Sequence, residues 1–214
     1  MNNPSIHENE AGHQALRAAA RATGLDTTRD HFLFLRHGRT AGNVSRIFQH
    51  PDIPLCTEGF GDADLAADVL RSATFDHICA SDMARAWLTA GRIAAATAKP
   101  VLAKQALRER YFGDFIGTSS VGLDWRIDPP NGETLAGFVL RTLQGIAALL
   151  TAPPLPLLVS HGGVLRVLCG ALDVELPLAL TANALPLAFE RRAGTWHVTA
   201  LMPLSADLST AGVA

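Results

Sequence analysis

The sequence predicts an α/β fold, a three-layer sandwich in which helices cover both faces of a mainly parallel central sheet. Two observations carry this prediction. From residue 31 onward, short apolar runs alternate with longer segments of helical spacing. The apolar runs are also continuous rather than alternating, as expected for strands buried on both faces. Strands that alternate with helices usually pair in parallel and are covered from both sides.

Composition and charge exclude several classes of protein. Hydrophobic residues make up 48% of the 214 residues and charged residues 18%, which excludes a largely disordered chain. The formal net charge of −2 shows no basic excess, so we expect no nucleic-acid and no membrane partner. No apolar run approaches the ~20 residues that span a bilayer, and the N-terminus lacks a signal-peptide pattern. We therefore expect a soluble, cytoplasmic protein with free buried thiols at its separated cysteines, Cys56, Cys79 and Cys169.

Residues 1–30 form an extension ahead of the alternating pattern. Within it, an Ala- and Arg-rich stretch over 15–22 predicts a short helix that stops at Gly24. We expect the extension either to pack as an arm, on the domain or on the partner subunit of a homodimer, or to fray. We assign residues 31–204 to one domain and expect residues 205–214 to be a mobile tail.

The first half of the domain predicts three strands and two helices. Phe32–Leu35 is a buried strand, followed by a helix over 57–70 with Leu65 and Val69 on its apolar face. Residues 75–80 form the next strand. Ser81 is the expected N-cap of a helix over 83–97, and a weaker strand follows at 101–103.

The second half opens with a loop over 110–132 that is rich in Gly, Ser, Asp and Pro. Helical spacing then predicts a helix over 133–150. The remaining predicted elements are a strand at 157–160, a helix at 164–172, and two strands at 185–190 and 195–201 joined by a turn.

Charged side chains follow the predicted strands at their carboxyl ends, where ligands bind in sheets of this kind. Taken singly, each of these side chains has a simpler explanation, as part of a polar loop, as a solvated helix residue, as one half of an exposed ion pair or as part of a tight turn. Together, at one edge of the sheet, they are much less expected by chance. The residues are Arg36 and His37 after the first strand, Arg85 after the second, Glu109 after the third, and His161 after the strand at 157–160.

These residue types suit a phosphoryl group. Arginine offers planar, permanently charged forks for phosphate oxygens. Because Gly162 has no side chain, the backbone can come close to the phosphate, and amides at the helix N-terminus can donate to it as well. One histidine can act as a covalent nucleophile, while a second, cationic histidine stabilises charge on the transferring group. A carboxylic acid can protonate the departing oxygen.

Seven short motifs follow one another between about residues 32 and 200. They are Arg36-His37-Gly38, Asn43, Pro54-Leu55-x-Thr57-x-Gly59, Ser81-Asp82-x-x-Arg85, Leu107-x-Glu109, Gly132-Glu133-Thr134 and Ser160-His161-Gly162-Gly163. In this order they resemble the histidine phosphatase (phosphoglycerate mutase-like) superfamily. The resemblance implies a three-layer α/β sandwich and a two-step reaction through a phosphohistidine, with no metal and no organic cofactor.

The resemblance also implies a role for each matching residue. His37 would accept the phosphoryl group. Glu109 would act as general acid on the leaving oxygen and then as general base on water. Burial would help Glu109 keep its proton, whereas neighbouring arginines would oppose this, and the sequence leaves both outcomes open. The oxygens would be clamped by Arg36, Arg85 and His161, with help from Asn43 and the Gly162 amide.

The chain departs from the family pattern in three places. The extension precedes a motif that usually lies close to the N-terminus. Arg39 stands where many relatives carry Glu or Gln, and we expect it either to add a cation beside the pocket, suited to a second anionic group on the substrate, or to be solvated. A Gly113-Asp114-Phe115-Ile116-Gly117 stretch replaces the usual Gly-x-Trp-Glu-Gly, so substrate specificity does not transfer. Trp125, in the same loop, is expected to pack or to line the pocket.

Only 22 residues separate Glu109 from Gly132, where mutases of the family carry a longer insertion. A short segment leaves a phosphoenzyme open to water and so favours hydrolysis. We therefore predict a phosphomonoesterase acting on a small phosphorylated metabolite. The alternative is a phosphoglycerate mutase-type phosphotransferase. Two other classes stay open, a metal-dependent hydrolase and a non-catalytic module that binds phosphorylated ligands.

Overall fold

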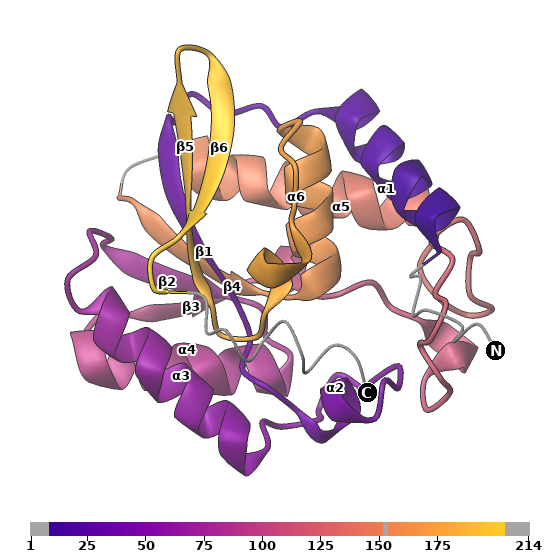
Figure 1. The fold of residues 1–214 in the computed structure, drawn as a ribbon, viewed down its shortest axis with the longest axis horizontal. Helices are drawn as coiled ribbons and strands as arrows, with labels where there is room; N and C mark the ends of the chain where they lie inside the picture. Colours follow the sequence, from indigo (N-terminus) through magenta and orange to yellow (C-terminus); the bar gives the residue numbers. More distant parts are fainter. Residues whose placement is uncertain (1–8, 152–153, 204–214) are drawn as a thin grey trace, which may run out of the picture.

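The computed structural model describes residues 9–151 and 154–203, so the expected tail at 205–214 lies outside the described residues. At its centre is a six-stranded sheet in the order β3-β2-β4-β1-β5-β6 (Figure 1). Strands β1 to β4 pair in parallel, whereas β5 runs antiparallel to both β1 and β6. The predicted mainly parallel sheet is confirmed. The strands are β1 (His31–Arg36), β2 (His77–Ala80), β3 (Val101–Ala103), β4 (Pro156–Ser160), β5 (Pro186–Arg192) and β6 (Thr195–Ala200).

Helices cover both faces of the sheet (Figure 1), which confirms the three-layer sandwich. Successive side chains of a strand point to opposite faces. Phe32 and Phe34 accordingly pack in the core with α1, α5 and α6, while Leu33 and Leu35 pack with α3 and α4. In the described part of the chain, no helix has both the length and the apolar character needed to cross a membrane. The larger helices are α1 (Glu10–Thr23), α3 (Thr57–Leu70), α4 (Ala84–Thr97), α5 (Leu135–Thr151) and α6 (Gly162–Ala171).

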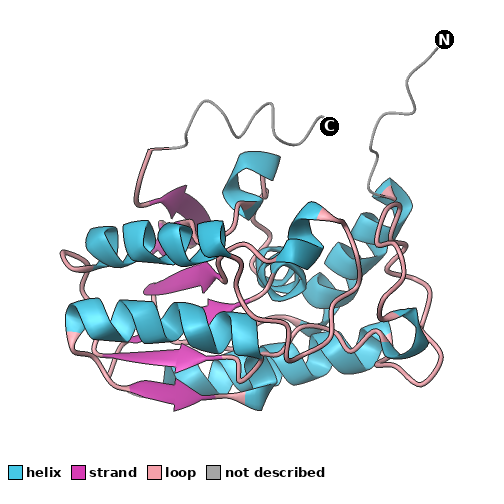
Figure 2. Ribbon diagram, turned by 90° about the horizontal axis from the view of Figure 1, so that it is seen from below, coloured by secondary structure: helices cyan, strands magenta, loops and turns pink. Residues whose placement is uncertain are grey.

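Short helical turns lie mainly in the loops beyond the carboxyl ends of the parallel strands. In Figure 2, the arrowheads of these strands point toward the side where most of the loops gather. The sequence analysis predicts the candidate site residues at this same edge of the sheet. The turns are α2 (Ala41–Val44), η1 (Gln105–Leu107), η2 (Gly113–Phe115) and η3 (Leu178–Thr181).

The N-terminal extension packs on the domain through α1. The helix begins earlier than predicted because the Asn9 side chain accepts a hydrogen bond from the amide of Gly12 at its first turn. It ends at Gly24, as predicted, where the backbone adopts a φ of 69°. Leu16 and Ala20 are buried in the same core cluster as α5 and α6.

Two details of the expected helices are wrong. Leu65 is 59% exposed, because the buried face of α3 is formed by Ala63, Ala66, Ala67 and Leu70, which follow the helical period. Ser81 is not the N-cap of α4, because the N-cap position lies two residues later, at Met83. Its hydroxyl instead accepts from the Met83 amide and bonds to a histidine described below.

The three cysteines are unpaired, as predicted. Cys79 and Cys169 are buried, whereas Cys56 is half-buried at the start of α3. Burial raises the pKa of the Cys169 thiol to about 12, so this thiol stays protonated and behaves as a small apolar group.

Candidate active site

Strands β1 and β4 end side by side and bring two histidines together. Arg36 is in register with Ser160, and the amide of His37 donates to the Ser160 carbonyl at 2.9 Å. His37 and His161 therefore directly follow two neighbouring strands at the same edge of the sheet. Their ring centroids lie 5.1 Å apart, with His37 only 3% exposed and His161 fully buried.

A cavity of about 260 Å³ opens at this edge. Six of the eight site residues predicted from the sequence line it, whereas His161, whose ring centroid lies 5.1 Å from that of His37, and Arg39 do not. The lining residues among the predicted set are Arg36, His37, Asn43, Arg85, Glu109 and Gly162.

The His37 ring is held in one tautomer. Its Nδ1 lies 2.8 Å from the carbonyl oxygen of Gly38, which can only accept, so Nδ1 carries the proton and Nε2 keeps a free lone pair. Burial, reinforced by the charges of Arg85 and Arg36, lowers the pKa of His37 well below its ordinary value of 6.5. The imidazole is therefore neutral at pH 7 and available as a nucleophile.

Asn183 supports the backbone of this histidine, and the sequence analysis missed it. Its side-chain amide donates to the His37 carbonyl at 2.8 Å and reaches the Asn43 side-chain oxygen at 3.3 Å. That oxygen also accepts from the Thr40 amide at 3.1 Å. With its oxygen held in this way, Asn43 keeps its NH₂ group for the cavity that it lines.

His161 differs from the expected cationic partner. Burial first, and the nearby charge of Arg85 second, lower the pKa of His161 well below 6.5, so the ring is neutral. Its Nε2 lies 2.8 Å from the Ser81 hydroxyl, which already accepts from the Met83 amide and so has its own proton to donate. The tautomer that accepts this proton carries its hydrogen on Nδ1, a buried atom without a partner in the described residues.

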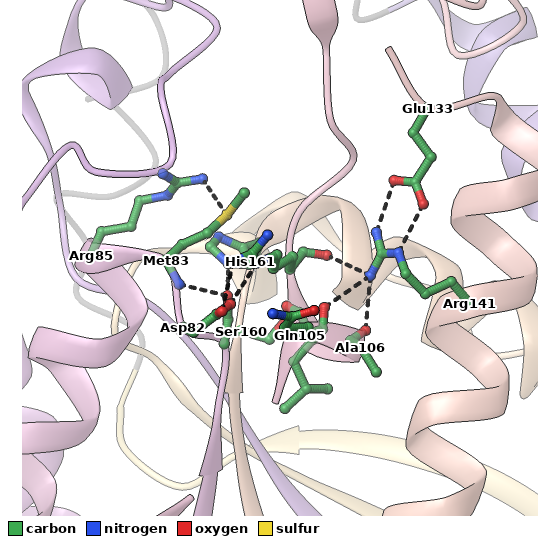
Figure 3. A network of polar contacts seen from close by, with 12 residues as sticks. Asp82, Met83, Arg85, Gln105, Ala106, Glu133, Arg141, Ser160 and His161 are labelled. Carbon is green, nitrogen blue, oxygen red and sulfur yellow. Dashed lines mark hydrogen bonds and ion pairs between the residues drawn. The ribbon is translucent and has the colours of Figure 1, made fainter. Parts of the chain in front are cut away.

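Arg85 is 3% exposed and has weak partners for a buried cation. It donates to the His50 carbonyl at 3.2 Å and to the Met83 sulfur at 3.4 Å, while its Nε has no partner in the described residues. Figure 3 shows this guanidinium beside Met83 and next to His161. Because buried donors normally find an acceptor, the Nε of Arg85 and the Nδ1 of His161 point to an anion as their missing partner.

Glu109, which also lines the cavity, is held by two backbone amides. Its Oε1 accepts from Arg110 at 3.0 Å and its Oε2 from Gly163 at 2.8 Å. A Cβ at position 163 would lie 2.2 Å from Oε1, so this approach requires glycine. Gly162 begins α6, and amides in a first helical turn have no partner within the helix, which makes them donors for an anion in the cavity.

A network of arginine contacts holds the segment that carries Glu109, and it was not predicted. Arg141 pairs with both carboxylate oxygens of Glu133 and donates to carbonyls of Gln105, Ala106 and Arg108 (Figure 3). Arg110, whose side chain is fully buried, donates to the carbonyls of Glu133, Trp125 and Ile127 and pairs with Asp128. Single arginines in a loop give no sequence signal for such contacts.

The structure corrects the expected position of Arg39. Its guanidinium pairs with both carboxylate oxygens of Asp62 at 2.6 and 2.8 Å and does not line the cavity. Asp62 on α3 draws the side chain outward. Other basic residues line the cavity instead, among them Arg46, Arg166 and, from the N-terminal extension, His13.

Trp125 both packs and lines the cavity. It lies between Phe112 and Phe138, with ring centroids 6.0 Å away on each side. Phe48 extends this aromatic wall through Phe112 at 4.4 Å. Aromatic rings and arginines therefore both line the cavity.

Comparison with known proteins gives a consistent picture. The family model described as the histidine phosphatase superfamily (branch 1) matches residues 32–198. The chain is 32% identical over 162 residues to an adenosylcobalamin/alpha-ribazole phosphatase of Salmonella typhimurium, covering 68% of this chain and 80% of that protein. It is 32% identical over 171 residues to a glucosyl-3-phosphoglycerate phosphatase of Mycobacterium tuberculosis, covering 69% and 76%. It is also 33% identical over 175 residues to a probable phosphoglycerate mutase of Proteus mirabilis, covering 74% and 77%.

A solved structure shares the fold. The mycobacterial glucosyl-3-phosphoglycerate phosphatase in complex with VO3 superimposes with a TM-score of 0.67 at 27% identity, covering 80% of this chain and 98% of that chain.

Proposed function

The chain belongs to branch 1 of the histidine phosphatase superfamily, and from that premise we propose that it is a phosphomonoesterase acting on a small phosphorylated metabolite through a phosphohistidine on His37. The observation that carries the proposal is the buried, neutral His37, which lines the cavity with Arg85 and whose ring centroid lies 5.1 Å from that of His161, two residues that each keep a buried donor without a partner in the described residues. A phosphoryl group placed there meets a nucleophile and hydrogen-bond donors together.

In the first step, Nε2 of His37 attacks phosphorus and the bond from phosphorus to the ester oxygen breaks. Arg36, Arg85 and Nδ1–H of His161 donate to the non-bridging oxygens, which carry the negative charge. Asn43 and the α6 amide at Gly162 add donors from the cavity wall. Glu109 in its acid form gives a proton to the departing oxygen, which leaves as an alcohol.

In the second step, Glu109 as a carboxylate takes a proton from water while the water oxygen attacks phosphorus. The bond between phosphorus and Nε2 breaks, inorganic phosphate leaves and His37 returns to its neutral form. The amide contacts from Arg110 and Gly163 hold the carboxylate in one place for both steps. All of these groups come from the chain, so the proposed reaction needs neither metal nor organic cofactor.

The short segment after Glu109 supports hydrolysis over phosphotransfer. Between Glu109 and Gly132 it forms one 3₁₀ turn, Gly113–Phe115, and one bridge between Ser119 and Ile47. Nothing in this stretch has the length of a helical lid that would keep water from a phosphoenzyme. The related proteins include both phosphatases and a probable mutase, so the phosphoglycerate mutase-type reaction is the alternative.

A panel of metabolite phosphoesters tests this function. We expect release of inorganic phosphate, with specificity constants that rank the substrates, and undiminished rates in EDTA. Conversion of 3-phosphoglycerate to 2-phosphoglycerate faster than phosphate release would favour the mutase. Loss of activity in EDTA and its return with a divalent ion would favour a metal-dependent hydrolase. If no ester is turned over, the result would favour a non-catalytic module that binds phosphorylated ligands.

A further inference from the structure

We propose that Trp125 is a positioning residue for the acid Glu109, and that the N-terminal helix α1 fixes the place of Trp125 through Gly12. This inference rests on the proposed function, in which Glu109 gives a proton to the departing oxygen. It assigns a part in the reaction to a helix that precedes residues 32–198, the region that the chain shares with its family.

Trp125 lies next to the carboxylate of Glu109. Oε1 of Glu109 and Cη2 of the indole both crowd the Cβ position of Gly163, at 2.2 and 2.8 Å. Two backbone amides already hold the two carboxylate oxygens. The indole, which is 4% exposed and stacks on Phe138 of α5, therefore closes a further side of the carboxylate. If the ring moved away, the carboxylate would gain room to turn from the departing oxygen, and proton transfer depends on this geometry.

The loop that carries Trp125 has little support of its own. The described residues from 116 to 134 form no helix and no strand, apart from the single bridge at Ser119. One support comes from Arg110, the residue after Glu109, whose Nη1 donates to the Trp125 carbonyl at 3.1 Å. Trp125 thus depends on contacts with distant parts of the chain to keep its place beside the acid.

The second support is α1. A Cβ at Gly12 would lie 2.7 Å from the amide nitrogen of Trp125 and 2.9 Å from a carboxylate oxygen of Asp124. The first turn of the helix therefore rests directly on the backbone of the loop, and only glycine permits this approach. Figure 1 shows the start of α1 beside the loop. The next residue, His13, lines the catalytic cavity itself.

The helix α1 is fixed to the domain and can act as a rigid support. Leu16 and Ala20 are buried in the same core cluster as Trp125. On the side of α6, a Cβ at Gly170 would lie 3.0 Å from the Cβ of Ala20, so the two helices pack closely. The amide that holds Oε2 of the acid belongs to the first turn of α6. Through α6 and the loop, α1 supports two of the groups that surround the carboxylate.

Two aryl esters of nearly the same shape test the inference. Phenyl phosphate needs a proton on its leaving oxygen far more than p-nitrophenyl phosphate does. We expect Gly12→Ala to lower kcat/KM about tenfold for phenyl phosphate and less than about threefold for p-nitrophenyl phosphate. Gly61→Ala is the control, because it makes the same change in α3, where the Cβ position is open, and should leave both rates unchanged. Equal losses on the two esters, or no loss, would overturn the role of α1.

Variants of Trp125 test the next step of the inference without disturbing the helix. Trp125→Ala should lower kcat/KM for phenyl phosphate at least about tenfold more than for p-nitrophenyl phosphate, and Trp125→Phe, which keeps a ring, should recover most of the loss. Circular dichroism and thermal melting check that each variant is folded. A destabilised but otherwise normal site would lose both activities in parallel. That result, or a Phe variant no better than the Ala variant, would show that the ring does not position the acid.

The wild-type protein separates this inference from the proposed function. If it hydrolyses both aryl esters while the Gly12 and Trp125 variants keep the wild-type ratio of the two rates, the phosphatase stands and the inference is wrong. If the wild-type protein hydrolyses neither ester nor any metabolite, both are wrong.

Discussion

Gly163 donates its backbone amide to Oε2 of Glu109 across 2.8 Å, and the absence of a side chain at position 163 is what lets the carboxylate come so near. Both glycines of the pair line the cavity, and the second also holds the Glu109 carboxylate. The Gly162-Gly163 sequence thus does more than turn the chain from β4 into α6.

Gly163→Ala should displace the Glu109 carboxylate, because the new Cβ would meet Oε1 at 2.2 Å. We expect kcat/KM for glycerol phosphate, an alkyl ester with a poor leaving group, to fall about 10- to 100-fold. Gly91→Ala is the control: Gly91 lies on α4 with open space around its Cβ position, so the alanine should add about 0.5–1 kcal/mol of stability and leave the rates unchanged. Wild-type rates in Gly163→Ala would show that this contact does not position the acid.

Glu109→Gln should reveal the leaving-group dependence of a general acid. Because p-nitrophenolate leaves without help from a proton, kcat/KM for p-nitrophenyl phosphate should fall only a few-fold. For glycerol phosphate the loss should reach 100-fold or more. Glu190→Gln, which removes an acid paired with Arg192 on β5, controls for the charge change. Equal losses on both esters would argue against the acid role.

Protein stability should depend on pH through His37 and His161. Both pKa values lie well below 6.5 in the folded protein, first because of burial and then because of Arg85. As pH falls, the unfolded chain takes up these protons before the folded chain does. The stabilising contribution is therefore complete above about pH 6.5 and is lost as pH falls toward the folded pKa values, at about 1.4 kcal/mol for each pKa unit between the two states.

Urea unfolding at pH 8, 7, 6 and 5 measures this loss. His37→Gln should lose less stability than the wild type between pH 7 and 5, whereas a Gln variant of the exposed His197 should follow the wild type. The opposite trend, a wild-type protein that gains stability toward pH 5 relative to His37→Gln, would mean that the buried ring is protonated.

Arg110→Met should loosen the segment that carries Glu109. The variant keeps much of the side-chain volume but loses the bonds to three carbonyls and the pair with Asp128, all made by a fully buried guanidinium. We expect a loss of about 2–4 kcal/mol in the free energy of unfolding. Arg126→Met, in the same loop but 55% exposed, should cost less than about 1 kcal/mol. Equal denaturation midpoints for Arg110→Met and the wild type would show that these contacts do not stabilise the protein.

Much of the fold and of the candidate site could be predicted from the sequence, because both depend on local patterns. The continuous apolar run of β1 and the glycine at the end of α1 mark their elements directly. Parallel strands end at one edge, so residues such as His37 and His161, far apart in the chain, converge without any knowledge of their contacts.

The details that depend on distant partners did not follow. Whether Arg39 or Arg46 faces the cavity is decided by Asp62 on α3 and by the bridge from Ile47 to Ser119. His13 reaches the site only because α1 packs on α6, which brings together residues more than 150 positions apart. The neutral state of His161 likewise depends on complete burial.

Direct detection of a phosphoryl group on His37 tests the central claim. Glu109→Gln, mixed with p-nitrophenyl phosphate, should form the phosphoenzyme normally but hydrolyse it slowly, because the base for water is gone. After an alkaline quench, which preserves bonds between phosphorus and nitrogen, mass spectrometry should find one added phosphoryl group on the peptide that contains His37. The same treatment of a His37→Asn, Glu109→Gln variant should give none. Turnover without this modification, or near-normal rates in His37→Asn alone, would contradict the account.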